Sequence, residues 1–274
     1  MATALRFKSM GQKEKEKLLR LDRYLAEMGA GSRSELKKGI RDGLARVNGT
    51  IEKDPGRKVT GEDLVTYRGR EIAYEKYVYY MLYKPAGVIS ATEDKKQKTV
   101  LDLIDEDQKR GDLFPAGRLD KDTEGLLLIT NDGDLAHALL SPARHVDKVY
   151  LARVDGPLTG EDCGAFAEGL QVDEGLQAMP ARLEILEAGR ETSLARVTIR
   201  EGKYHQIKRM FQARGREVLY LKRLSMGPLV LDESLLPGQW RRLREEELAA
   251  LKEAAAPARN APDLSGNERH DGEK

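Results

Sequence analysis

A carboxylate in a glycine-bounded turn is the first group in the sequence whose setting suggests chemistry. Asp120 ends the segment Gly117-Arg118-Leu119-Asp120 and precedes an apolar run at residues 126–129. An aspartate in a turn is usually structural, because its carboxylate accepts hydrogen bonds from nearby backbone N–H groups. A carboxylate fixed beside a buried strand can also serve as a nucleophile or a general base. The residues alone leave both interpretations open.

The sequence lacks the patterns that mark several common catalytic and cofactor sites. There is no Gly-x-Gly-x-x-Gly after a predicted strand, no Gly-x-x-x-x-Gly-Lys phosphate loop and no Gly-x-Ser-x-Gly elbow. The four histidines have no zinc-binding spacing, and Cys163 is the only cysteine. Residues 120–125 imitate the start of a calcium loop, but its twelfth position is Asn131 instead of Glu. We therefore expect neither a metal ion nor another cofactor.

The charge of the chain is unevenly distributed. The 274 residues include 47 Lys+Arg and 46 Asp+Glu, which gives a formal net charge of +1. Residues 1–70 hold 17 basic and 10 acidic residues, a net charge of +7, and the remainder carries −6. This asymmetry indicates a polyanion-binding module in front of a domain with another task.

A helix pair followed by a small sheet is predicted between residues 20 and 70. Apolar residues at 21, 24, 25 and 28 recur at helical spacing, and Ser32 with Glu35 forms a capping box for a second helix. Asn48-Gly49 predicts a tight turn between two strands. Basic side chains on a helix are suited to binding phosphates. The second helix carries four of them: Arg33, Lys37, Lys38 and Arg41.

After residue 70, strands mix with short helices. Asp132 or Asp134 is predicted to begin a helix, and Tyr204, Ile207 and Phe211 lie at helical spacing. No regular βαβ rhythm appears, which favours an α+β fold with a mixed, largely antiparallel sheet. The strands are expected at residues 77–83, 126–130, 148–154 and 192–200.

Composition and apolar patterning predict the state of the two chain ends and the cellular location of the protein. A basic arm at residues 1–19 and a tail at 253–274 lack apolar periodicity and are predicted to be disordered. Between them we expect two domains, at residues 20–70 and 71–252. The longest apolar run is far below the roughly 20 residues that span a bilayer. No signal peptide is evident, so we expect a cytoplasmic protein that contacts no membrane.

The segment from 20 to 70 resembles the S4 RNA-binding domain. The resemblance implies that the helix pair holds RNA, with Arg33, Lys37, Lys38 and Arg41 as the contacts. It rests on five blocks: Leu21-Asp22-Arg23-Tyr24-Leu25, Ser32-Arg33-Ser34, residues 40–43, Val47-Asn48-Gly49 and residues 59–64.

The remainder resembles the RsuA-type pseudouridine synthases of bacterial ribosomal RNA. Residues 117–127, around Asp120, look like the signature of that family, and an S4 domain in front is its usual arrangement. The resemblance covers about residues 20–250. Three more blocks agree in the same order: Lys84-Pro85-Ala86-Gly87, Lys148-Val149-Tyr150 and Glu201-Gly202-Lys203-Tyr204-His205-Gln206-Ile207-Lys208-Arg209-Met210.

The resemblance implies that the protein isomerises a uridine in RNA to pseudouridine. The N1–C1′ bond breaks, the uracil turns, and C5 bonds to C1′, without a cofactor. Asp120 carries over as the essential carboxylate, which either attacks C1′ or removes the C2′ proton. The sequence leaves both routes open. The base must also leave its stack, which costs a few kcal/mol.

The same resemblance assigns four supporting residues around Asp120. Lys208 supplies the cation that keeps the carboxylate ionised, and Ile207 forms an apolar wall beside it. Many relatives carry Arg at this point, and Lys lacks the bidentate geometry of a guanidinium. Tyr150 stacks on the uracil, and Arg118 helps to extrude the target nucleotide and takes its place in the RNA.

The sequence also predicts a target. Residues 204–211 are closer to small-subunit than to large-subunit enzymes, which points to a uridine in 16S ribosomal RNA. The same chemistry on 23S ribosomal RNA, a non-catalytic S4-type assembly factor and an RNA glycosidase that releases uracil are the alternatives. We expect a monomer whose partner is ribosomal RNA or a subunit assembly intermediate.

Overall fold

The computed structural model of the chain describes residues 18–106, 108–173 and 176–256. It divides into unit 1, which comprises residues up to Tyr77 with Ile104–Leu113, and unit 2, which comprises Val78–Leu103 and the chain from Phe114 onward. The predicted disordered ends fall largely outside the described residues, although β1 begins at Leu19 and α6 ends at Ala255. The domain boundary at residue 70 stays a prediction.

Unit 1 has the predicted pair of helices and small sheet. Its four-stranded sheet is antiparallel in the order β3-β2-β5-β6, and β1 pairs with β4 separately. The elements are β1 Leu19–Arg20, α1 Leu21–Glu27, α2 Arg33–Arg41, β2 Ala45–Val47, β3 Thr50–Glu52, β4 Lys58–Val59, β5 Val65–Tyr67 and β6 Arg70–Glu71.

Local sequence explains how these elements begin and end. Ser32 and Glu35 form the predicted capping box at the start of α2, where each side chain bonds the other's backbone N–H. Asn48 and Gly49 both take positive φ angles, 51° and 83°, as a tight turn between β2 and β3 requires. Burial of a side chain such as leucine contributes about 1.5–3 kcal/mol. The fully buried core includes Leu21, Leu25, Leu36, Ile40 and Val65.

Unit 2 is built on a larger sheet with helices at its sides. Its elements are β7 Tyr79–Lys84, the 3₁₀ helix η1 Val100–Leu103, β8 Phe114–Pro115, β9 Glu124–Thr130, α3 Gly133–Leu140, η2 Pro142–Arg144, β10 Lys148–Asp155, α4 Gly160–Glu168, β11 Gln171–Asp173, β12 Leu176–Gln177, β13 Arg182–Ala188, β14 Thr192–Ile199, α5 Gln206–Ala213, β15 Val218–Met226, β16 Leu229–Val230, β17 Trp240–Arg242 and α6 Glu245–Ala255.

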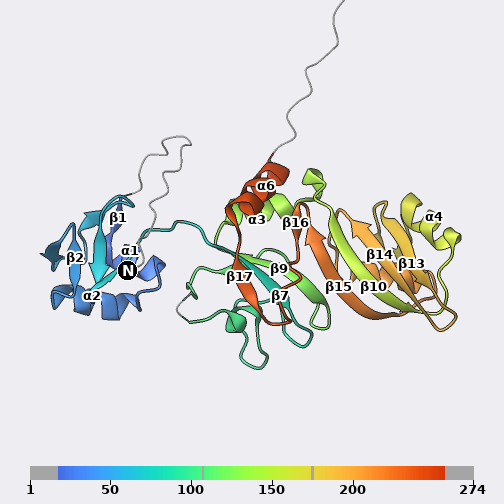
Figure 1. Cartoon of the computed structure of the whole chain (residues 1–274), viewed down its shortest axis with the longest axis horizontal. Coiled ribbons are helices and arrows are strands. Elements are labelled where there is room, and N and C mark those ends of the chain that lie inside the picture. The colour runs from blue at the N-terminus through green and yellow to red at the C-terminus, as the bar shows by residue number, and fades with distance from the viewer. Residues whose placement is uncertain (1–17, 107, 174–175, 257–274) are drawn as a thin grey trace, which may run out of the picture. The chain divides into compact units, whose positions relative to one another are not determined.

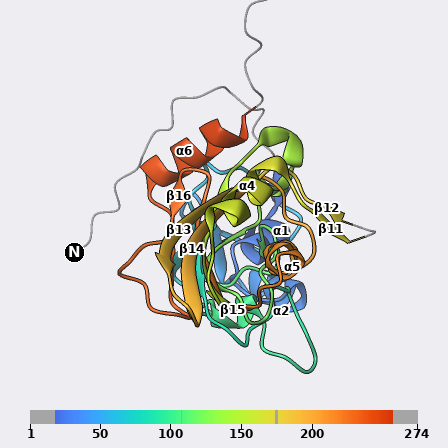
Figure 2. The same cartoon turned by 90° about the vertical axis from the view of Figure 1, so that its right-hand side faces the viewer.

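The main sheet has, within the described residues, nine strands. Seven follow the order β13-β14-β10-β15-β9-β7-β17, while β16 joins β15 and β8 joins β9 (Figure 1). Its neighbours are antiparallel except for β15 and β9, so the predicted mixed, largely antiparallel sheet is confirmed. Helices α3 and α6 pack on each other, and α4 packs on β13. Helix α5 contacts β15 and the hairpin strand β11 (Figure 2).

Strands β9 and β15 approach closely where β9 begins. Gly125 has a φ of 103°, and a Cβ there would collide with the backbone of Arg223. The buried Arg223 side chain crosses to β9, where its Nε donates to the Leu126 carbonyl at 2.7 Å. This junction fixes the start of β9, which follows the turn that contains Asp120.

Two details of the predicted helices are resolved by the structure. Asp132, rather than Asp134, caps α3, because its carboxylate accepts the backbone N–H of Leu135 at 3.1 Å. The helical spacing assigned to Tyr204 is wrong. Helix α5 begins only at Gln206, because His205 has a left-handed backbone (φ 50°), and Tyr204 lies before the helix with 75% of its surface exposed.

We predict that Gly125→Ala destabilises unit 2 by about 2–4 kcal/mol, because it adds both backbone strain and a clash with Arg223. Trp240, the single tryptophan of the chain, lies in β17 of the same sheet, so its fluorescence during urea unfolding reports on this unit. Gly133→Ala is the matched control, since a Cβ at the start of α3 meets nothing within 4 Å. Equal unfolding midpoints for the two variants would contradict the prediction.

Candidate active site

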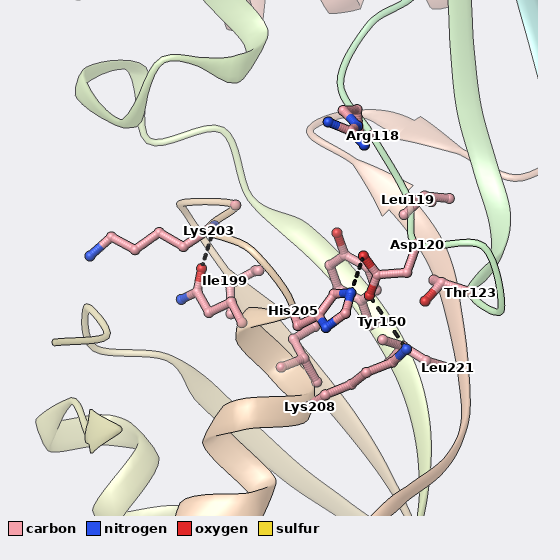
Figure 3. Close-up of a pocket in the computed structure, with 13 residues that line it drawn as sticks. Arg118, Leu119, Asp120, Thr123, Tyr150, Ile199, Lys203, His205, Lys208 and Leu221 are labelled. Carbon is pink, nitrogen blue, oxygen red and sulfur yellow. Dashed lines mark hydrogen bonds and ion pairs between the residues drawn. The ribbon is translucent and has the colours of Figure 1, made fainter. Parts of the chain in front are cut away.

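Asp120 lies in the turn between β8 and β9, and its carboxylate points into a pocket (Figure 3). Ser90 holds one side of this turn: its hydroxyl accepts the backbone N–H of Leu119 at 3.0 Å and donates to the Leu119 carbonyl at 2.9 Å. The N–H of Thr123 closes the turn on the Asp120 carbonyl at 3.1 Å. Backbone atoms and Ser90 thus hold the turn, and the Asp120 carboxylate faces the pocket.

A buried lysine holds the other side of the turn. The Lys84 ammonium, at the end of β7, donates to the carbonyls of Pro85 (3.0 Å), Lys121 (3.2 Å) and Thr123 (2.8 Å). The backbone N–H of Gly87 also reaches the Lys121 carbonyl at 2.8 Å. Burial lowers the pKa of Lys84 to about 8, against the nearby carboxylates, which act to raise it. The Lys84–Gly87 motif is therefore a structural support of the Asp120 turn.

Two nitrogen groups from the region of α5 flank the Asp120 carboxylate. Lys208 Nζ lies 3.4 Å from Oδ2, and His205 Nε2 lies 3.4 Å from Oδ1 (Figure 3). The side chain of Asp120 is 27% exposed and that of Lys208 24%, so the pair is partly shielded from water. Asp120 and Lys208 thus form an ion pair at the edge of the pocket.

Lys208 is shared between two carboxylates. Its Nζ lies 2.6 Å from Asp122 Oδ1, closer than to Asp120. Partial burial acts to raise the pKa of Asp122, but the hydrogen bond and charge of Lys208 outweigh it and leave this pKa below its usual value. Since the Asp122 side chain is 72% exposed, the shielded member of the pair is Asp120.

A buried glutamine shapes the backbone that precedes α5. Gln206 Oε1 accepts the N–H of Lys203 at 3.0 Å, and its Nε2 donates to Glu201 Oε1 at 2.7 Å. Glu201 is itself buried and accepts the N–H of Met179 at 2.8 Å. This network holds the left-handed His205, which costs of order 1–3 kcal/mol of backbone strain.

The remaining predicted site residues line the same pocket, whose volume is about 60 Å³. Tyr150 on β10 and Ile207 on α5 are buried and form part of its apolar wall. Arg118 also lines the pocket, although Figure 3 shows its side chain apart from the cluster of Asp120, Lys208 and His205. The structure therefore brings all five predicted residues to one pocket.

The calcium interpretation fails on geometry. Residues 126–129, which would form the second half of the loop, lie in the buried strand β9. Within the described part of the chain, no group of three or more His, Cys, Asp or Glu side chains is placed to hold a metal ion. None of the helices described there has the length and apolar character needed to cross a membrane.

The basic residues predicted to bind RNA lie on α2 of unit 1. The four side chains are exposed, while Leu36, Gly39 and Ile40 of the same helix face the core. Three of the basic residues stand four positions apart and so share one row along the helix. The four residues are Arg33, Lys37, Lys38 and Arg41.

His205 is the neighbour of Asp120 that the sequence did not single out. The only hint in the sequence was that His205 belongs to the same block as Lys208, three positions further on. Residue spacing does not predict the left-handed backbone of His205, whose ring lies beside Asp120. A partly shielded carboxylate with two flanking nitrogen groups can act as a nucleophile or a base, and a buried aromatic ring nearby can stack on a flat, polar ring.

The comparisons with known proteins agree with this geometry. The family model described as RNA pseudouridylate synthase matches residues 78–213, and that of the S4 domain matches residues 19–65. A solved structure described as a pseudouridylate synthase is 37% identical with a TM-score of 0.60, covering 85% of this chain and 99% of that one.

Two curated relatives match nearly their full length. The chain is 46% identical to an uncharacterised RNA pseudouridine synthase of Bacillus subtilis, YtzG, over 87% of this chain and 100% of the relative. It is 41% identical to ribosomal small subunit pseudouridine synthase A of Vibrio vulnificus, over 85% of this chain and 99% of the relative. The resemblance inferred from the sequence is confirmed: the chain belongs to the RsuA-type family of RNA pseudouridine synthases with an N-terminal S4 domain.

Proposed function

We propose that this enzyme isomerises a specific uridine of 16S ribosomal RNA to pseudouridine, with Asp120 as the reacting carboxylate. The observation that carries the proposal is the setting of that carboxylate. It is partly shielded, it faces Lys208 and His205 at 3.4 Å each, and it stands in a turn fixed by Lys84 and Ser90. A group held in this way loses little entropy when it meets a reacting atom.

The chemistry needs only groups that line the pocket. In one route Asp120 attacks C1′ and displaces uracil through N1; the uracil turns, C5 bonds to C1′, the carboxylate leaves, and the proton on C5 is lost while N1 gains one. In the other, Asp120 removes the C2′ proton while the N1–C1′ bond breaks and uracil leaves, which gives a glycal. C5 of the turned uracil then bonds to C1′, the proton returns to C2′, and C5 loses its proton while N1 gains one. Both routes require an ionised carboxylate, and Lys208 places its ammonium group 3.4 Å from that of Asp120. The structure is compatible with either.

The pocket wall supports roles for three further residues. Tyr150 offers a buried aromatic ring on which uracil can stack, and Ile207 offers an apolar surface beside Lys208. Arg118, apart from the other charged groups, is available to occupy the gap that the flipped nucleotide leaves in the RNA.

Helix α2 is proposed to anchor the RNA through its exposed basic row. A phosphate contact adds affinity without selecting a base, so this helix contributes binding strength, and the pocket contributes the choice of base. The expected partner is ribosomal RNA or a subunit assembly intermediate, bound in the cytoplasm by one copy of the chain.

The choice of 16S ribosomal RNA rests on the block at residues 204–211 and on the relatives. One relative is the small-subunit enzyme of Vibrio vulnificus at 41% identity, but ribosomal large subunit pseudouridine synthase B of Bacillus subtilis is 39% identical over 88% of this chain and 99% of its own. The same chemistry on 23S ribosomal RNA is therefore the second candidate.

We predict that Asp120→Asn lowers isomerisation at least about 10³-fold, because the amide can neither attack C1′ nor accept a proton. RNA affinity and the urea midpoint should change little, since partly exposed ion pairs contribute at most about 1 kcal/mol. Asp122→Asn is the matched control: it removes the other partner of Lys208 and should stay within about tenfold of the wild type. Pseudouridine formation in ribosomal RNA would be measured for both, and full activity of Asp120→Asn would refute the assignment.

We predict that the double variant Lys37→Gln and Arg41→Gln weakens RNA binding and lowers the log–log salt slope by about 2, one for each lost phosphate contact. Binding to ribosomal RNA would be measured across a salt titration. Arg182→Gln, which removes an exposed charge at the start of β13, is the control and should leave the slope unchanged. An unchanged slope in the double variant would remove α2 from the RNA interface.

We predict that cells lacking this protein lose one pseudouridine from 16S ribosomal RNA and none from 23S. Mapping pseudouridines in both RNAs, with and without the protein, tests the target directly. A loss in 23S would move the enzyme to the second candidate. Release of free uracil from RNA incubated with the purified enzyme would instead indicate a glycosidase.

A further inference from the structure

An exposed aromatic ring stands next to the pocket. Tyr204 has 75% of its surface exposed, the largest fraction among the exposed large hydrophobic side chains of the described residues. One face of its ring is covered by the imidazole of His205, with the ring centroids 3.8 Å apart and the planes inclined by 18°. The same imidazole meets the Asp120 carboxylate through Nε2. Tyr204, His205 and Asp120 thus form a continuous path from the surface to the reacting group.

The backbone beneath the two rings is firmly held. Gln206 bonds both Lys203 and Glu201, and Lys203 also donates through Nζ to the Gln177 carbonyl at 2.8 Å. His205 keeps a left-handed conformation within this network. An aromatic ring presented by a fixed backbone loses little entropy when a ligand stacks on it.

The stacked pair also lies where the pocket meets a second, larger groove. His205 and Lys208 line both the 60 Å³ pocket and a groove of about 580 Å³ that runs beside α5. The groove is polar. Its basic side chains are Lys208, Arg209 and Arg216, and the carboxylates of Asp122, Asp155 and Glu217 also line it. A nucleotide next to one held in the pocket can reach this border, where Lys208 and Arg209 offer cations to its phosphate.

We propose that the Tyr204–His205 pair is a stacking platform for the nucleotide adjacent to the target uridine in the RNA. The base of that nucleotide lies on the outer face of Tyr204, and the pair replaces a stacking partner that the neighbour loses when the uridine flips out. This rests on the proposed function, because it takes the flipped uridine to occupy the pocket. It assigns Tyr204 to substrate binding rather than to the chemical step.

Stacking on Tyr204 also affects the imidazole of His205, which lies between Tyr204 and Asp120. A base stacked on Tyr204 presses that ring against His205, whose Nε2 contacts Asp120. Binding of the neighbour therefore restricts the imidazole to the position seen beside the carboxylate. Tyr204 itself remains a binding residue, and only His205 of the pair contacts the Asp120 carboxylate.

The test uses the full-length enzyme and a synthetic fragment of the ribosomal RNA that the wild type isomerises. Two further RNAs carry an abasic nucleotide immediately 5′ or 3′ of the target uridine. Tyr204→Ala removes the ring, whereas Tyr204→Phe keeps the stacking face and serves as the conservative variant. Leu236→Ala removes an exposed apolar side chain from the loop before β17 and is the control for surface changes. The values of kcat and KM are measured for every combination of enzyme variant and RNA.

On the intact RNA, Tyr204→Ala should raise KM by roughly 5- to 150-fold, which is about 1–3 kcal/mol at 1.4 kcal/mol per tenfold. Tyr204→Phe and Leu236→Ala should stay within about twofold of the wild type. With the wild-type enzyme, one of the two abasic RNAs should raise KM by a similar factor. With Tyr204→Ala the same abasic RNA should raise KM no further, because the stacking contact is already missing.

Wild-type behaviour of Tyr204→Ala on intact RNA would overturn the proposal, and so would an abasic penalty that is the same in wild type and variant. A loss confined to kcat would also overturn it, since that would place Tyr204 in the chemical step. If the wild type isomerises no ribosomal RNA fragment, the proposed function itself fails, and this is seen before any variant is measured.

Discussion

The hydrogen bonds of the Lys84 ammonium group are the interactions on which the geometry of the candidate active site depends. A fully buried cation is costly unless it is surrounded by polar groups. Here three carbonyls of the 85–123 region meet it, two of them from the turn that carries Asp120. Their carbonyls must face inward to do so, and the backbone of the turn is set accordingly. The chain thus uses a buried lysine to position a carboxylate on another segment.

A second constraint acts from the opposite end of the turn. Gly125 allows the backbones of β9 and β15 to approach, and Arg223 ties them through the Leu126 carbonyl. Helix α5, which delivers Lys208, packs against the same β15. The carboxylate of Asp120 and the ammonium group of Lys208 are therefore both positioned by the same sheet. The distance between them is set by backbone packing more than by the flexible lysine side chain.

The sequence predicted features that depend on neighbouring residues. The capping box of Ser32, the Asn48-Gly49 turn and the buried run in β9 all arise from local preferences, and each was confirmed. The five predicted pocket residues came from the family resemblance, because no local rule distinguishes Asp120 from an ordinary turn aspartate.

What the sequence did not reveal depends on contacts between distant residues. The left-handed backbone of His205 relies on a buried glutamine bonded to Glu201, and it moves Tyr204 out of the helix that spacing had predicted. The burial of Arg223 likewise follows from strand order, which residue periodicity does not encode. Such features become visible only when the sheet is assembled.

The parallel contact between β9 and β15 also bears on when the enzyme becomes competent. Arg223 and Leu126 are 97 positions apart in sequence, and Lys208 is 86 positions from Asp122. Contacts of such long range require large loops to close and form late in folding. A nascent chain that has not yet produced α5 contains Asp120 but neither of the nitrogen groups beside it. A polypeptide that ends before His205 and α5 therefore carries the Asp120 turn without His205 and Lys208 beside it.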